Sequence, residues 1–122
     1  MALNRIRLEL ARTPEFPQGS PDHGYEFAAP LTKDGHIDAH AWKDVRQRCE
    51  VVRFWGSEQL QTGMLRHVGK GWRFDYNAND SSDDEPFFKL DTHVLAPGAY
   101  VSITEQDGVQ RPFKVTSVLP AH

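Results

Sequence analysis

Apolar and polar residues alternate along most of this chain, and a repeat of two residues is typical of a half-buried β-strand. Near the N-terminus the alternation runs from Arg5 to Leu10. It is strongest in the last quarter of the chain, where segments 100–104 and 113–118 flank the dipeptide Asp107-Gly108. An Asp-Gly turn between two alternating segments predicts a β-hairpin. The pattern therefore indicates an antiparallel, mainly β protein.

Shorter alternating segments between these regions predict further strands. They are residues 25–31, 49–55, 60–68, 72–76 and 88–94. Residues 13–24 carry three prolines and two glycines, which predicts an irregular connection, and the polar residues 77–86 predict a loop. Gly63 marks an expected bulge. Pro112 lacks an N–H group and is expected at a sheet edge or a bulge.

Residues 38–48 break the two-residue repeat, because Trp42, Val45 and Cys49 recur at helical spacing. Asp38 precedes this segment, and its carboxylate can accept a hydrogen bond from the free backbone N–H groups of a first helical turn. We therefore predict one helix near residues 38–48, which covers one end of the sheet.

These elements amount to about seven or eight short strands and one helix, without an internal repeat. A sheet of this size protects its edges by closing, so the predicted fold is a small antiparallel β-barrel or a strongly curled sheet. A two-sheet β-sandwich is the alternative. The 122 residues fit one domain, residues 1–122. An exposed edge near Pro112 or along residues 60–68 would allow a homodimer.

The composition narrows the classes of partner and the compartment. A net charge of −3 argues against nucleic acid or an anionic membrane surface as the partner. The single cysteine, Cys49, excludes an intramolecular disulfide, and its place after an apolar helical stripe predicts a buried, inert thiol. No apolar stretch is long enough for a membrane span, and the N-terminal residues are charged where a signal peptide is apolar. The predicted location is the cytoplasm.

The densest group of chemically capable side chains lies between residues 23 and 40. It consists of His23, Glu26, His36, Asp38 and His40. Histidines with carboxylates can hold a divalent metal ion whose bound water acts as a nucleophile, so one alternative function is a metal-dependent enzyme. Capping of the helix by Asp38 competes with this hypothesis, because capping occupies the carboxylate. No other cofactor is indicated.

Four acidic residues of the predicted loop 77–86 are a candidate site for a calcium ion or for a basic partner. They are Asp80, Asp83, Asp84 and Glu85. The surrounding pattern departs from an EF-hand, because Asp80 stands where that motif requires glycine and the preceding residues predict a strand.

Three arginines, Arg53, Arg66 and Arg73, lie among aromatic residues in the middle of the chain. Single-stranded nucleic acid is bound by such a combination, through phosphate pairing and base stacking. These arginines are the candidate face of a second alternative, a single-stranded nucleic-acid-binding β-barrel. Aromatic residues on one face of a strand are also the expected core, and the arginines are then a solvated surface.

The segments 23–31, 34–38, 49–55 and 97–103 are spread over most of the chain. They include His23-Gly24-Tyr25-Glu26-Phe27 and Arg53-Phe54-Trp55. Together they resemble small bacterial proteins of uncharacterised function. The resemblance implies a bacterial, cytosolic, single-domain protein, and it assigns no functional residue.

The sequence lacks the common motifs of nucleophilic catalysis and phosphate binding. It has no Gly-x-Ser-x-Gly elbow, no Cys-x-x-Cys pair and no glycine-rich phosphate loop. The leading interpretation is therefore a small binding or interaction module without catalytic activity, whose partner is another protein or a small ligand.

Overall fold

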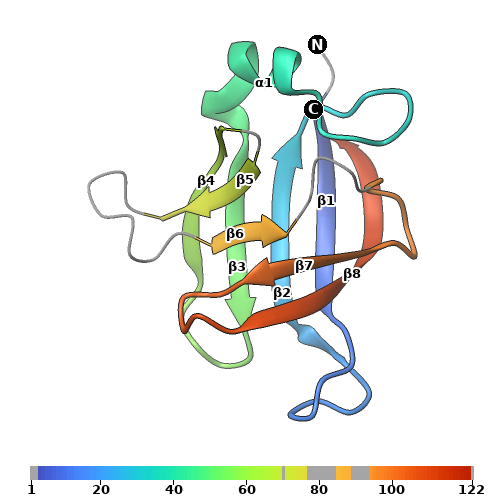
Figure 1. The fold of residues 1–122 in the computed structure, drawn as a ribbon, viewed down its shortest axis with the longest axis vertical. Coiled ribbons are helices and arrows are strands. Elements are labelled where there is room, and N and C mark those ends of the chain that lie inside the picture. Colours follow the sequence, from blue (N-terminus) through green and yellow to red (C-terminus); the bar gives the residue numbers. More distant parts are fainter. Residues whose placement is uncertain (1–2, 70, 77–84, 89–93, 122) are drawn as a thin grey trace.

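The computed structural model describes residues 3–69, 71–76, 85–88 and 94–121, which form eight antiparallel strands and one α-helix (Figure 1). The strands are β1 (Leu3–Leu10), β2 (Ser20–Ala29), β3 (Glu50–Trp55), β4 (Gln61–Val68), β5 (Gly71–Asp75), β6 (Glu85–Phe88), β7 (Tyr100–Thr104) and β8 (Gln110–Ala121). The helix α1 (Ala39–Val45) continues directly into a 3-10 turn at Arg46–Arg48.

Each strand pairs with the next one along the chain, and β8 pairs with β1, so the sheet closes into a barrel. The pairing of β1 with β8 extends from Leu3 opposite Ala121 to Leu10 opposite Phe113. The predicted mainly β barrel with one helix is thereby confirmed, and the fold is not the alternative sandwich. All eight described strands have two neighbours, so neither β4 nor β8 offers the exposed edge through which a homodimer could form.

Pro112 does not lie at an edge, because it stands in β8 opposite Ser102 of β7. The irregularity of β8 lies further along the strand, where the pairs Arg7–Ser117 and Leu8–Val115 leave one extra residue. In a closed sheet, proline is tolerated where its missing N–H group is not needed by the ladder. The expected position of this residue was therefore wrong because closure of the barrel removes the edge.

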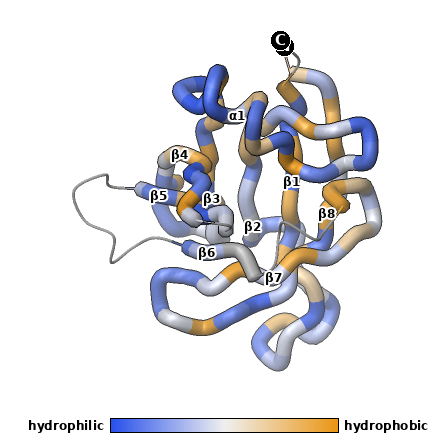
Figure 2. The backbone as a smooth tube through the Cα atoms, turned by 45° about the horizontal axis from the view of Figure 1, so that its top comes forward, coloured by the Kyte–Doolittle hydropathy of each residue, from blue (hydrophilic) through white to orange (hydrophobic). Residues whose placement is uncertain are grey.

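Alternate side chains of the strands fill the barrel interior, and Figure 2 shows hydrophobic and hydrophilic residues alternating along the strands. The rings of Tyr25 and Phe27 both contact Phe74, with centroids 5.0 and 5.2 Å apart. Trp72 and Phe74 are buried, and Tyr76 packs against the same cluster. The three aromatic residues of this segment thus share the core face, as their spacing predicts.

The helix covers one end of the barrel, as predicted, and we call this end the helix end (Figure 1). Asp38 caps α1, because its Oδ1 accepts a hydrogen bond of 3.0 Å from the backbone N–H of Ala41. Trp42 is buried beneath the helix, and its Nε1 donates to the carbonyl oxygen of Leu65 at 3.1 Å. Cys49 is buried as well, and burial raises the pKa of its thiol to about 11, which leaves it inert at neutral pH.

Two strands begin earlier than the alternation predicts. β2 starts at Ser20, inside the expected irregular connection, and it approaches β1 so closely that a Cβ on Gly24 would stand 1.9 Å from the carbonyl oxygen of Leu8. β6 starts at Glu85, inside the expected loop, and ends at Phe88, where the sequence predicts a strand to begin. Because the inward position at the start of β6 is occupied by the charged residue Glu85, the apolar repeat does not reveal where this strand begins.

The expected bulge at Gly63 is absent, because Gly63 pairs with Val51 without a shift of register. The glycine has a different role in the barrel. A Cβ at this position would lie 2.5 Å from the carbonyl oxygen of Asp75, so only glycine allows β5 to approach β4 here.

Candidate binding site at the charged end of the barrel

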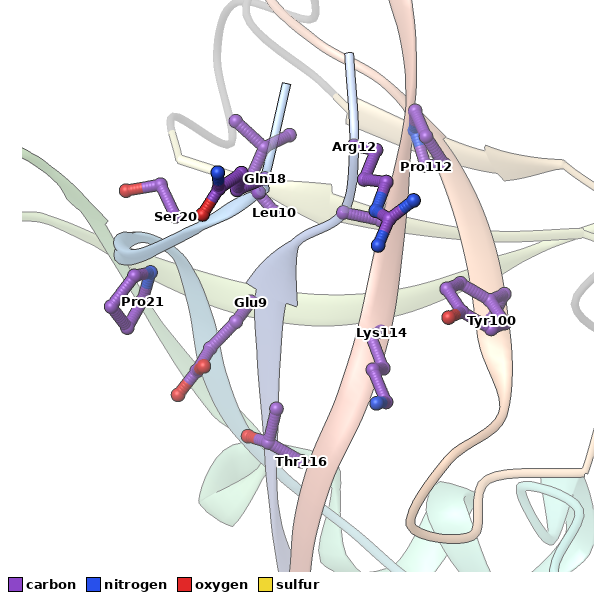
Figure 3. A pocket seen from close by; sticks show the side chains of 12 residues that line it. Glu9, Leu10, Arg12, Gln18, Ser20, Pro21, Tyr100, Pro112, Lys114 and Thr116 are labelled. Carbon is purple, nitrogen blue, oxygen red and sulfur yellow. The ribbon is translucent and has the colours of Figure 1, made fainter. Parts of the chain in front are cut away.

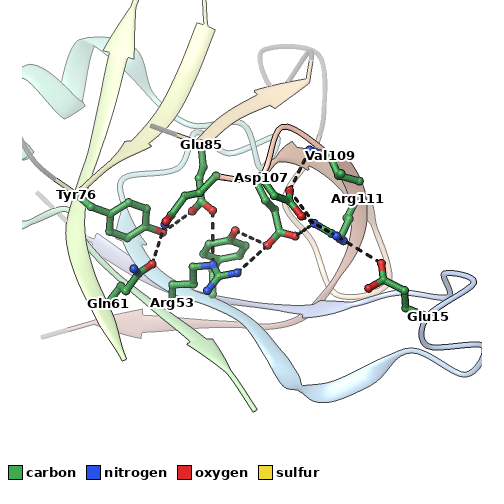
Figure 4. A network of polar contacts seen from close by, with 11 residues as sticks. Glu15, Arg53, Gln61, Tyr76, Glu85, Asp107, Val109 and Arg111 are labelled. Carbon is green, nitrogen blue, oxygen red and sulfur yellow. Dashed lines mark hydrogen bonds and ion pairs between the residues drawn. The ribbon is translucent and has the colours of Figure 1, made fainter. Parts of the chain in front are cut away.

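The two-residue repeat places polar and charged side chains inside the barrel at the end opposite α1, which we call the charged end (Figure 4). Four of them lie in strands, and two directly follow a strand. These residues are Tyr25 (β2), Arg53 (β3), Tyr76 (after β5), Glu85 (β6), Glu105 (after β7) and Arg111 (β8). We call this set the charged network.

Glu105 is the centre of the network, and only 3 % of its surface is exposed. Its Oε1 accepts a hydrogen bond of 3.0 Å from the hydroxyl of Tyr25 and one of 3.4 Å from Nη2 of Arg53. Its Oε2 accepts a short hydrogen bond from Nη1 of Arg111. One carboxylate therefore bridges two guanidinium groups from the non-adjacent strands β3 and β8.

Glu85 is fully buried, and its Oε1 accepts a hydrogen bond of 2.6 Å from the hydroxyl of Tyr76. Its Oε2 lies 3.5 Å from Nε of Arg53, but neither of these two atoms has a hydrogen-bond partner among the residues that the structure describes. Burial raises the pKa of Glu85 to about 7, although the hydrogen bond from Tyr76 and the charge of Arg53 act in the opposite direction. Glu85 is thus a carboxyl group that exchanges a proton near neutral pH.

The tyrosines of the network stay protonated at neutral pH. Burial raises the pKa of Tyr25 well above its ordinary value, and the negative charges of Glu85 and Glu105 act in the same direction. Burial and then the charge of Glu85 raise the pKa of Tyr76 in the same way. Both hydroxyl groups therefore serve as hydrogen-bond donors to the carboxylates.

Aromatic side chains hold Arg53 in place at the charged end. Its guanidinium carbon lies 4.4 Å from the centre of the Trp55 ring, a distance typical of a cation–π contact. The edge of Trp55 meets His23 with ring centroids 4.7 Å apart. His23 in turn packs on Phe16, and its Nδ1 is hydrogen-bonded to Ser20 at 2.7 Å.

The outer side of the network borders a groove of about 250 Å³, which we call the end groove. Its charged lining residues are Glu15, Arg53, Glu58, Glu105, Asp107 and Arg111, and Trp55, Gln61 and Gln106 complete it. Nη2 of Arg111 lies 2.9 Å from Asp107 and 3.4 Å from Glu15, so the groove wall is cross-linked by ion pairs. Nε2 of Gln106 donates to Oε1 of Gln61 at 2.7 Å, across the same rim.

Buried charges of this kind are costly to desolvate, and a well-packed apolar core of the same volume is often as stable. Perturbed pKa values and buried charges next to a groove are characteristic of functional sites. The charged network therefore marks this end of the barrel as the candidate site. It can hold a fixed arrangement of charges under a groove that is open to solvent.

The structure does not assemble the histidine and carboxylate residues of the metal hypothesis. Within the described ranges no three His, Cys, Asp or Glu side chains lie where they could hold a metal ion. His23 is engaged with Ser20, Glu26 accepts from Arg7 at 3.0 Å, and Asp38 caps α1. His40 is exposed on α1, and Nδ1 of His36 is buried without a hydrogen-bond partner in the described part of the chain. The physical reason is that each carboxylate already has another partner.

Of the four acidic residues of the predicted loop, the structure describes only Glu85. Asp80, Asp83 and Asp84 lie outside the described residues. Glu85 does not belong to an exposed loop, because its carboxyl group is buried in the barrel and bonded to Tyr76. The prediction of Glu85 as a surface ligand for calcium or a basic partner is therefore wrong.

The three arginines of the nucleic-acid hypothesis do not share one face. Arg53 points into the barrel, whereas Arg66 and Arg73 lie opposite each other in the pairing of β4 with β5. Arg66 forms an ion pair with the buried Asp75. Since strand neighbours two residues apart share a face, Arg53 is separated from the other two by the sheet itself.

Sequence reasoning missed most of the charged network, although a signal is present. Glu105 continues the inward repeat of Val101 and Ile103, and Arg111 precedes Phe113 in the same phase. A charged residue in the apolar phase of a strand is a sign of a buried polar site. The partner of each charge lies on a distant strand, so the pairs themselves require the fold.

Comparison with protein-family models, curated proteins and solved structures finds no match to this chain. Among the described residues, no helix has the length and apolar character that a membrane crossing requires.

Proposed function

We propose that this protein is a binding module that takes up a small organic cation in the end groove. The observation that carries the proposal is the charge of the groove. Its lining contains four carboxylates and two guanidinium groups, a surplus of two negative charges. A cationic group is the ligand whose charge complements such a surface.

The contacts of the two arginines support a cation over an anion. Arg53 is held by Glu85 and Glu105, and Arg111 is held by Glu105 and Asp107. An anionic ligand would have to displace these carboxylates and leave them buried without a partner, which is strongly unfavourable. A cation meets no such obstacle, because Glu58 lines the groove, is exposed and forms no ion pair within the described ranges.

The size of the groove limits the ligand to a few carbon atoms. Its volume of about 250 Å³ is smaller than that of most small-molecule sites, which span roughly 300–1,000 Å³. The network beneath it is fixed by hydrogen bonds and ion pairs from several strands, so the carboxylates are pre-organised and little ordering is needed on binding. Aliphatic amines and guanidines combine the right size and charge.

Titration with agmatine, which carries an ammonium and a guanidinium group, tests the proposal. We expect saturable binding by calorimetry and NMR shifts of the Trp55 indole and of residues 58–61 and 105–107. Succinate, a dianion of similar size, should not bind. The proposal is overturned if agmatine fails to bind at about 10 mM, because binding that needs a higher concentration is too weak to be specific. It is also overturned if the shifts map to another surface.

A matched pair of variants locates the site. Glu58 lines the end groove, whereas Glu50 is an exposed glutamate of β3 that does not line it. Glu58→Lys removes the surplus negative charge of the groove, so we expect agmatine affinity to fall about tenfold, equivalent to about 1.4 kcal/mol. Glu50→Lys makes the same change in net charge and should leave the affinity within about twofold. Equal losses would show that only the overall charge matters.

The cytoplasmic location and the bacterial origin stay predictions of the sequence, as does the absence of catalytic activity. They are compatible with a module that senses or carries a small cationic metabolite. The proposal itself depends only on the end groove and the charged network.

A further inference from the structure

A second groove lies on the outer face of the barrel beside β1 (Figure 3). Its volume of about 660 Å³ falls in the middle of the range of small-molecule sites, roughly 300–1,000 Å³. It is lined by the end of β1, parts of the connection between β1 and β2, the start of β2, one stretch of β8 and Tyr100 of β7. We call it the side groove. It shares no lining residue with the end groove.

Two irregularities of strand pairing shape the side groove. The pairing of β1 with β2 shifts between Glu9 and Leu10, and the pairing of β1 with β8 shifts between Arg7 and Leu8. Such bulges bend a strand and redirect its side chains, and they are over-represented next to functional sites. Gly19 lies in the groove wall with φ of 74°, and a Cβ there would stand 2.7 Å from the carbonyl oxygen of Leu10. The local backbone is therefore built around this hollow.

The groove carries positive charge in an otherwise acidic protein. Its one carboxylate, Glu9, is held by Nε of Arg7 at 2.7 Å, and Arg7 also bonds to Glu26 and to the carbonyl oxygen of Pro21. Arg12 and Lys114 are both exposed, and within the described ranges neither forms an ion pair. Two cations that form no ion pair within the described ranges thus line one groove of a chain whose net charge is −3, and one of them, Lys114, stands opposite Glu9 in the pairing of β1 with β8.

An exposed aromatic ring stands beside these cations. Tyr100 lies directly opposite Lys114 in the pairing of β7 with β8, and 56 % of its surface is exposed. In Figure 3 its hydroxyl group points toward β8 and Lys114. A tyrosine that is left exposed next to basic side chains offers a face on which a planar ring can stack.

We propose that the side groove binds a small organic phosphate that carries a planar ring, of the size of a nucleoside monophosphate. Arg12 and Lys114 hold the phosphate, and the ring lies against Tyr100. Arginine and lysine are the side chains that proteins use to bind phosphate. Two such cations match the double negative charge of a phosphate group better than they match the single charge of a carboxylate ligand. This site is independent of the proposed cation site, because the two grooves have different residues and opposite charge.

An NMR titration with adenosine monophosphate tests the inference. We expect shifts at residues 10–12, 18–21, 100 and 114–116, and no comparable shifts in the end groove. Adenosine alone and inorganic phosphate alone should each bind at least about tenfold more weakly, because each supplies half of the contacts. The absence of shifts at about 10 mM adenosine monophosphate, or shifts elsewhere on the barrel, would overturn the proposal.

Variants separate the roles of the lining residues. Arg12→Gln and Lys114→Gln should each weaken binding of adenosine monophosphate about tenfold. Tyr100→Ser should remove the preference for adenosine monophosphate over inorganic phosphate. Arg48→Gln is the control. Arg48 is exposed at the helix end, and its substitution removes the same single positive charge. If the control weakens binding equally, or if a single-stranded oligonucleotide binds these residues more tightly than the mononucleotide, the proposal is wrong. Failure of this test leaves the agmatine experiment unaffected.

Discussion

At the helix end of the barrel, the rings of Trp42 and Trp72 meet edge to face with centroids 5.6 Å apart, and the ring of His67 stacks on Trp72 at 4.2 Å. At the charged end, Arg53 lies between Glu85 and Glu105, each of which is bonded to a tyrosine. One end is closed by packing and the other by ion pairs. Both ends belong to one closed sheet, so they differ in the helix that covers one of them and in the side chains that fill them.

The comparison shows that the two ends are stabilised in different ways, and that only one of them carries groups that folding does not require. Apolar burial stabilises a barrel end without any need for specific partners. A buried ion-pair network requires every partner to be present, and loss of one leaves a charge without compensation. The helix end therefore fits a structural role. The charged end has the features of a site that holds charges in fixed positions beneath a groove.

The largest expected effect comes from removing the central cation of the charged network. Arg53→Met leaves Glu105 with one cation fewer and, among the described residues, takes away the only cation paired with Glu85, so the free energy of unfolding should fall by about 3–5 kcal/mol. Urea unfolding at pH 7, followed by tryptophan fluorescence, measures the loss. Arg48→Met at the helix end is the control and should change stability by less than about 0.5 kcal/mol. A loss below about 1 kcal/mol for Arg53→Met would mean that water compensates the network.

The pH dependence of stability should separate the two ends next. The pKa of Glu85 is about 7 in the folded protein and 4.5 ordinarily, so the folded state holds this proton more tightly. Its contribution is present below about pH 4.5 and is lost as the pH rises to about 7, by at most about 3 kcal/mol. Unfolding in urea between pH 5 and pH 8 measures the slope. Glu85→Gln, which still accepts from Tyr76, should flatten it, and an unchanged slope would exclude Glu85 as the titrating group.

A smaller effect is expected at the helix end. Trp42→Phe loses the hydrogen bond to Leu65 and part of the packing on Trp72, so the free energy of unfolding should fall by about 1–2 kcal/mol. Among the described residues, Trp42 and Arg53 have no hydrogen-bond, ion-pair or ring-contact partner in common, so their effects should add within about 0.5 kcal/mol in the double variant. Urea unfolding of the single and double variants at pH 7.5 checks this. A coupling above about 1 kcal/mol would show that the two ends do not act independently.

The local features of this protein could be predicted from its sequence because they depend on neighbouring residues. The Asp107-Gly108 hairpin, the capping of α1 by Asp38 and the burial of Trp72 and Phe74 each follow from a short-range pattern. Strand β6 was hidden because Glu85 occupies an inward position, and a charged residue there breaks the apolar repeat.

The sequence by itself thus determined the strands, the single helix and the mainly β class, since hydrophobic periodicity and turn chemistry act over a few residues. The tertiary structure alone decided which charges meet. Tyr25 and Glu105 are 80 positions apart in the chain, and Arg53 and Glu105 are 52 apart, yet closure of the barrel brings them within hydrogen-bond distance. Such pairing depends on the register of every strand between them, which no local pattern contains.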